Sequence, residues 1–97
     1  MPFPLQRTRI FSQESILDIS PGLPGIYGIY SSLRWIYIGQ ALDLQRRLLE
    51  HYNRTSNQAS DIWVNRPAYF VAMLVDPANL DAAETALVLE YMPICNK

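Results

Sequence analysis

Two short runs of apolar and aromatic residues, separated by a polar break, are the most regular feature of the hydrophobic pattern. The runs occupy residues 25–30 and 34–39, each is anchored by glycine, and Ser31 and Ser32 lie between them. Runs of β-branched and aromatic residues of this length favour strands, and a short polar interruption favours a hairpin. The pattern therefore predicts a β-hairpin over residues 25–39.

The register of this hairpin decides which side chains share a face, because side chains alternate between the faces of a sheet. We predict that Tyr27 lies opposite Tyr37 and Ile29 opposite Trp35, with residues 31–33 in the turn. This register places two phenol hydroxyls side by side. Cross-strand aromatic pairs are also ordinary structural features that contribute roughly 0.2–1 kcal/mol to a sheet, so the pair alone does not indicate chemistry.

Three later segments have clear patterns of their own. Residues 40–52 predict a helix, with Ala41, Leu44, Leu48 and Tyr52 in one apolar stripe. The continuous apolar run at 69–75 predicts a buried strand. A second helix is predicted near residues 80–92, with Asn79 as its N-cap and Pro93 beyond its end.

The remaining segments connect or cover these elements. Residues 1–24 form an N-terminal arm that we expect to pack on the domain, with Ser12 capping a short helix that runs to about Ile19. Residues 53–58 are polar and suggest a mobile loop, and residues 61–64 suggest a short helical or irregular clasp.

Length and composition limit the classes of protein. A chain of 97 residues with 49% hydrophobic residues can form one domain, 1–97, around one core. A net charge of −1 does not indicate a strongly cationic nucleic-acid binder, although seven of the eight basic residues are arginines, which suit phosphate. One cysteine excludes an internal disulfide, so we expect a reducing, cytoplasmic environment. Nothing in the pattern predicts a signal peptide or an association with a membrane.

Polar residues on the two predicted helices are the candidates for chemistry. Arg47 and His51 lie one turn apart at the border of the apolar stripe, where they can lean over the sheet, whereas Arg46 projects toward solvent. Glu84 falls at the centre of the apolar stripe of the last helix. A carboxylate in this position needs a cation or several donors, so a core ion pair with Arg47 and a metal ligand are equal alternatives.

The motifs of the hairpin resemble those of a known nuclease family. Gly25-Ile26-Tyr27 followed by Tyr37-Ile38-Gly39 is similar to the paired signature of the GIY-YIG nuclease superfamily. The resemblance is to the catalytic domains of excision-repair incision subunits and intron homing endonucleases. In that family an arginine, a glutamate and an asparagine beyond a proline complete the motif, and some members carry a histidine one turn after the arginine. The matching residues here are Arg47, Glu84, Asn96 and His51.

The resemblance implies a fold and an activity. The fold is α+β, with a central three-stranded antiparallel sheet near residues 25–30, 34–39 and 69–75, flanked by helices. The activity is endonucleolytic hydrolysis of phosphodiester bonds in DNA with one divalent ion, Mg²⁺ or Mn²⁺, held by Glu84.

The resemblance also implies roles for the other matching residues. Arg47 would clamp the phosphate, and Tyr27, helped by Tyr37 or His51, would take the proton of the attacking water. Asn96 would orient a tyrosine or a phosphate. The residues that we expect to contact substrate are Gly39, Gln40 and Arg46, and Gln40 stands where many repair relatives carry a lysine.

Low basic charge affects the expected partners. A slightly acidic chain attracts phosphate weakly. We therefore expect its affinity for DNA to depend on a protein partner, on a homodimer, or on a structured or branched substrate. The resemblance suggests a role in DNA repair or in a mobile element. The competing hypothesis is a non-catalytic module that keeps the fold and binds nucleic acid or a protein. Metal binding at Glu84 separates the two hypotheses.

Overall fold

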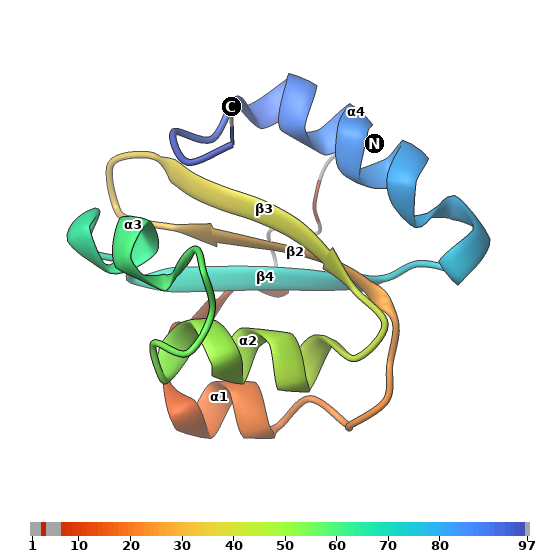
Figure 1. Cartoon of the computed structure of the whole chain (residues 1–97), viewed down its shortest axis with the longest axis horizontal. Helices are drawn as coiled ribbons and strands as arrows, with labels where there is room; N and C mark the ends of the chain where they lie inside the picture. Colours follow the sequence, from red (N-terminus) through yellow and green to blue (C-terminus); the bar gives the residue numbers. More distant parts are fainter. Residues whose placement is uncertain (1–2, 4–6, 97) are drawn as a thin grey trace.

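The computed structural model describes residue 3 and residues 7–96. These residues form one antiparallel sheet with strand order β1-β4-β2-β3, packed between helices (Figure 1). The strands are β1 (Arg9–Ile10), β2 (Gly25–Tyr30), β3 (Trp35–Ala41) and β4 (Tyr69–Leu74). The helices are α1 (Gln13–Leu17), α2 (Leu44–Tyr52), α3 (Ala59–Val64) and α4 (Leu80–Tyr91), and a 3₁₀ turn over Pro77–Asn79 leads into α4.

The expected α+β class, with an antiparallel sheet packed against helices, is confirmed. The three central strands lie within two residues of their predicted bounds. A fourth strand, β1, was not predicted: Arg9 and Ile10 pair with Phe70 and Tyr69 of β4. Two residues are too short a run to give a strand pattern, so only the pairing in space reveals β1.

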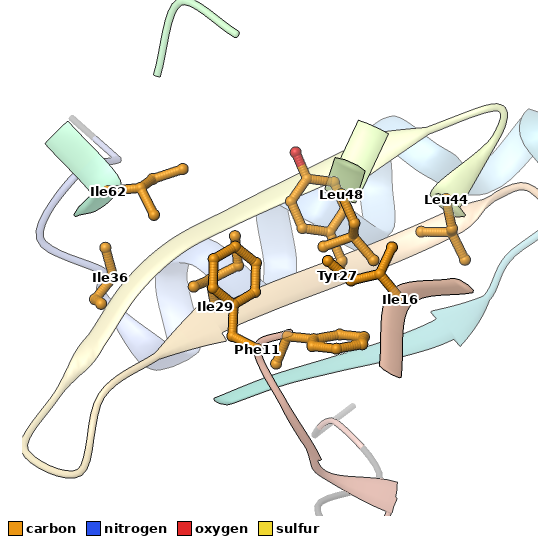
Figure 2. Close-up of a cluster of buried hydrophobic side chains, with 9 residues drawn as sticks. Phe11, Ile16, Tyr27, Ile29, Ile36, Leu44, Leu48 and Ile62 are labelled. Atoms are coloured by element: carbon orange, nitrogen blue, oxygen red, sulfur yellow. The ribbon is translucent and has the colours of Figure 1, made fainter. Parts of the chain in front are cut away.

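Helices cover both faces of the sheet. In Figure 1, α4 lies over one face, and α1 and α2 lie under the other. The core on the α2 side consists of Phe11, Ile16, Tyr27, Ile29, Ile36, Leu44, Leu48, Ile62 and Phe70. The core on the α4 side consists of Phe3, Ile26, Ile38, Val71, Leu80 and Leu87. Figure 2 shows that the Tyr27 ring belongs to the first core and that its oxygen points away from Phe11.

The predicted register of the hairpin is wrong by two residues. Tyr27 lies opposite Gly39, and Ile29 lies opposite Tyr37. The register shifts after Ile29, so that Tyr30 lies opposite Trp35 and β3 contains one extra residue. A β-bulge of this kind breaks the simple alternation on which the prediction depended. Tyr27 and Tyr37 nevertheless share a face, with ring centroids 6.2 Å apart.

The helices begin and end close to their predicted bounds, with one exception. Helix α2 begins at Leu44 and not at Gln40, because Gln40 and Ala41 complete β3 and the Asp43 side chain accepts the Arg46 N–H as the N-cap. Ser12 caps α1, as predicted, by accepting the Ser15 N–H. Within the described residues, every helix is too short or too polar to span a bilayer.

Candidate active site

The centre of the site is a buried hydrogen bond between β2 and α2. The Tyr27 hydroxyl oxygen and the His51 Nε2 are 2.6 Å apart, and both side chains are 0% exposed. His51 was expected at the border of the apolar stripe, but the structure buries it completely. The Tyr27 hydroxyl lies against Gly39 of β3, where an added Cβ would overlap the phenol oxygen. The absence of a side chain at Gly39 therefore makes room for Tyr27.

The second ring nitrogen of His51 has a partner from the loop after α2. Its Nδ1 lies 2.6 Å from the Ser56 Oγ. Burial, together with the positive charge of Arg47, lowers the pKa of His51 to about 4. The imidazole is therefore neutral near pH 7, with one nitrogen available as a hydrogen-bond acceptor.

The two tyrosines differ in their contact with solvent. Tyr27 is fully buried, whereas Tyr37 is half-buried. Burial raises the pKa of the Tyr27 phenol far above its ordinary value, and the neighbouring Tyr37 raises this pKa further. Burial also raises the pKa of Tyr37, and Arg47 opposes that shift. Both phenols are therefore protonated at neutral pH, and Tyr37 is the one that solvent can reach.

Arg47 is held in place by two neighbours. One terminal guanidinium nitrogen donates to Glu50 at 2.8 Å and the other donates to Gln58 at 2.9 Å. The guanidinium also lies close enough to hydrogen-bond the hydroxyls of Tyr27 and Tyr37. Arg47 lines a surface hollow together with Arg46, whose side chain is 79% exposed. The predicted difference between the two arginines is thus confirmed: Arg47 leans over the sheet and Arg46 faces solvent.

Asn96 serves the backbone of β3. Its Oδ1 accepts the Ile38 N–H and its Nδ2 donates to the Ile38 carbonyl, both at 2.8 Å. The preceding residues continue this pairing, since Ile94 and Cys95 donate to the carbonyls of Trp35 and Ile36. The Asn96 amide thus fixes the strand between Tyr37 and Gly39, and its expected role in orienting a tyrosine or a phosphate stays a prediction.

Glu84 meets a different partner from the one considered in the sequence. Its Oε1 accepts the Gln40 Nε2 at 2.8 Å, and the same nitrogen donates to Asp81 at 2.7 Å. Within the described residues, Arg47 pairs with Glu50 and leaves Glu84 to Gln40. Glu84 is half-buried, not fully buried, because α4 lies over the edge strand β3 where Gln40 reaches it.

The oxygens on the α4 side suit a hard cation. The described residues contain no cluster of three or more histidine, cysteine, aspartate or glutamate side chains that could enclose a metal ion. Mg²⁺ does not need such a cage, since it keeps several waters and takes one or two carboxylates. Glu84 provides a half-exposed carboxylate close enough to contribute to the raised pKa of Tyr37. The donor set therefore fits an ion shared between protein, water and substrate.

Comparisons with known proteins bear on the fold. No protein-family model and no curated protein matches the sequence. Among solved structures, the GIY-YIG N-terminal endonuclease domain of UvrC from Thermotoga maritima, bound to its catalytic magnesium ion, superposes with a TM-score of 0.74. The two sequences are 26% identical over 88% of this chain and 94% of that domain. A point mutant of the same domain in which asparagine is replaced by alanine also has a TM-score of 0.74, at 24% identity.

The chain has the fold of a GIY-YIG endonuclease domain. Within this GIY-YIG fold, the structure brings together most of the residues predicted from sequence. Tyr27, Tyr37, Arg47 and His51 surround one point between β3 and α2. Glu84 adjoins this point across the edge of β3, where Gln40 binds it.

Four residues of this candidate site were missed in the sequence. Glu50 and Gln58 hold Arg47, Ser56 contacts His51, and Asp81 shares the amide of Gln40. Glu50 lies four residues after Arg46 and three after Arg47. Side chains at these spacings are neighbours on a helix, so the sequence could have identified Glu50 as an ion-pair partner. Ser56 and Gln58 belong to the loop that was expected to be mobile, and nothing in the local pattern shows that their side chains bind the site.

Proposed function

We propose that this chain is a metal-dependent endonuclease that hydrolyses phosphodiester bonds of DNA by in-line attack of water. The observation that carries the proposal is the buried hydrogen bond between Tyr27 and neutral His51, with Arg47 beside it, in the fold of a magnesium-bound endonuclease domain. A binding module has no need for a neutral, fully buried imidazole as the partner of a phenol. A reaction that removes a proton from water does need an acceptor of this kind.

A comparison of spacings supports the same assignment. The Thermotoga domain was crystallised as single mutants of three tyrosines and one asparagine, whose successive spacings along that chain are 10, 14 and 45 residues. Tyr27, Tyr37, His51 and Asn96 are separated by the same 10, 14 and 45 residues. In this correspondence His51 takes the place of a tyrosine.

The attacking water would give up its proton to the Tyr37 oxygen, while the Tyr37 hydroxyl proton passes to Tyr27 and the Tyr27 proton passes to His51 Nε2. Tyr37, which is half-buried, meets the water, and Tyr27 lies beneath it with its hydroxyl 2.6 Å from His51 Nε2. Neutral His51 can accept the Tyr27 proton, which makes the phenol oxygen a better acceptor in turn. Direct proton transfer from water to Tyr27, as expected from sequence, would first require water to reach a buried hydroxyl.

Arg47 would bind the phosphate that is attacked. Glu50 and Gln58 fix the plane of the guanidinium, so its N–H groups can meet the non-bridging oxygens in a defined direction. A divalent ion held by Glu84 supplies, when bound, positive charge that stabilises the leaving oxygen. Arg46 and Gln40 lie at the rim of the site, where a nucleic-acid backbone would pass.

The experiment that tests the proposal compares Glu84→Gln with the parent protein on supercoiled plasmid and branched DNA oligonucleotides. Reactions contain Mg²⁺, Mn²⁺ or chelator, and calorimetry measures Mn²⁺ binding to each folded protein. We expect cleavage to fall at least ~100-fold in Glu84→Gln, with Mn²⁺ binding lost. The free energy of unfolding should change by less than about 0.5 kcal/mol, because glutamine still accepts the Gln40 hydrogen bond.

The matched control is Glu90→Gln, which changes an exposed carboxylate further along α4. This variant should cleave DNA and bind Mn²⁺ like the parent. Full activity of Glu84→Gln would remove Glu84 from the metal site. If no substrate is cut and the folded parent binds no Mn²⁺, the domain is a non-catalytic module that uses the GIY-YIG fold for binding.

A further inference from the structure

Ser56 is the one neighbour of His51 Nδ1 that the described residues provide, and no motif identifies it. It lies outside α2, in the loop that joins α2 to α3, and its Oγ is 2.6 Å from the imidazole nitrogen. We propose that Ser56 is a positioning residue: its hydroxyl accepts the Nδ1–H of His51 and so leaves Nε2 free to accept the Tyr27 hydroxyl proton. This inference rests on the proposed function.

The direction of both hydrogen bonds follows from burial. A neutral imidazole has one donor nitrogen and one acceptor nitrogen. The hydroxyl proton of fully buried Tyr27 needs an acceptor, and its oxygen has His51 Nε2 within 2.6 Å. Nε2 is therefore the acceptor and Nδ1 carries the proton. Ser56 is half-buried, so its own hydroxyl proton can turn to solvent while its oxygen accepts from Nδ1.

The backbone holds the Ser56 hydroxyl in this position. The Ser56 N–H donates to the Glu50 carbonyl at 3.2 Å, and the Ser56 carbonyl accepts the Ala59 N–H at the start of α3. The carboxylate of the same Glu50 binds Arg47. Gln58, which accepts from Arg47, belongs to the same loop as Ser56. One loop therefore sets both the tautomer of His51 and the plane of the Arg47 guanidinium.

Loss of the Ser56 acceptor has a specific consequence. Without it, Nδ1–H would be a buried donor with no partner, and the imidazole would place its proton partly on Nε2. An Nε2–H points a donor at the Tyr27 oxygen, so this nitrogen can no longer accept the phenol proton. The effect acts on the proton path and leaves the phosphate-binding Arg47 in place.

The chain allows a direct measurement of the tautomer. His51 is its single histidine, so labelling with ¹⁵N-histidine gives one imidazole, whose nitrogen chemical shifts report which atom is protonated. The variants are Ser56→Ala and the size-matched pair Ser56→Thr and Ser56→Val, which differ in the hydroxyl. The matched control is Ser60→Ala, a change to an exposed serine of α3.

We expect the parent, Ser56→Thr and Ser60→Ala to hold the proton on Nδ1. Ser56→Ala and Ser56→Val should show a mixture with the Nε2–H form and a kcat for plasmid nicking about 10-fold lower, with KM unchanged. A single Nδ1–H tautomer in folded Ser56→Ala or Ser56→Val would overturn the proposal. So would a shifted tautomer with full kcat, or a Ser56→Thr variant as slow as Ser56→Val.

The proposed function can fail separately from this inference. If the parent cuts no substrate, the nuclease assignment fails. The nitrogen shifts then decide by themselves whether Ser56 sets the His51 tautomer, because they require no catalysis.

Discussion

Strand β3 separates two groups of polar side chains that differ in burial. On the α2 side, Tyr27 and His51 are fully buried, and their polar side-chain atoms are bound to neighbouring side chains. On the α4 side, the half-buried carboxylate of Glu84 and the exposed carboxylate of Asp81 share the flexible amide of Gln40.

The two sides of the site therefore differ in how firmly their polar side chains are held. Buried hydrogen bonds fix geometry and protonation state, because an unpaired polar group in the interior is costly. Half-exposed carboxylates can exchange partners with water and ions at little cost. The α2 side is thus suited to holding one arrangement of proton donor and acceptor, and the α4 side to taking up and releasing a ligand.

The largest predicted effect concerns Arg47, on the α2 side of the site. We expect Arg47→Lys to lower kcat for DNA cleavage by about 1,000-fold, equivalent to about 4 kcal/mol, because an ammonium cannot replace a guanidinium whose plane Glu50 and Gln58 fix. Arg46→Lys, on the adjacent and exposed residue, is the control and should change kcat less than about threefold. Equal losses in both variants would show that the fixed guanidinium has no special role.

A second prediction uses pH to measure the cost of burying His51. Its pKa is lowered from 6.5 to about 4, so between these pH values the unfolded chain binds a proton that the folded chain does not. The free energy of unfolding should therefore fall as the pH is lowered from 6.5 to 4, by about 3 kcal/mol from this group. Urea titrations across this range measure the change.

The control for the pH experiment is His51→Gln. The pKa of Glu50 is also lowered, chiefly by its hydrogen bond to Arg47, and adds acid sensitivity of the same sign below its ordinary value. The difference between the two proteins isolates His51, since both keep Glu50. Identical pH profiles would mean that the imidazole is more accessible to protons than its complete burial indicates.

The smallest predicted effect compares two amides, Asn96 at the edge of β3 and Gln40 on the α4 side of the site. Asn96→Ala removes both hydrogen bonds to the Ile38 backbone at the sheet edge and should lower the free energy of unfolding by about 2 kcal/mol. Gln40→Ala removes two hydrogen bonds to solvent-accessible carboxylates and should change it by less than about 0.5 kcal/mol. Urea unfolding checks both values, and a larger loss at Gln40 would show that its hydrogen bonds to Asp81 and Glu84 are not readily replaced by water.

The sequence identified much of the fold because local chemistry specified it. The apolar runs at 25–30 and 69–74 are strands, and Ser12 caps a helix, since side-chain alternation and capping depend on a few adjacent residues. The tyrosines, Arg47, His51 and Glu84 were found because they match a family motif and because helical spacing set the last three apart.

The errors fall where distant contacts decide. The register differs by two residues because the turn holds residues 31–34, one more than predicted, and because a bulge adds one further residue to β3. For Glu84 the sequence left an ion pair with Arg47 and a metal ligand as equal alternatives, and the structure gives Arg47 to Glu50 and Gln58 and Glu84 to Gln40. Each of these outcomes depends on contacts between residues far apart along the chain, which the hydrophobic periodicity of the sequence does not show.

The sequence by itself determined which residue types are available for the chemistry and which elements carry them. Only the tertiary structure decided their state: that His51 is neutral, that Tyr27 is sealed from water while Tyr37 is not, and that Ser56 touches the imidazole. The physical reason is that protonation and hydrogen-bond direction depend on burial and on the partners within about 3 Å, and a fold sets both by bringing together residues that lie far apart along the chain.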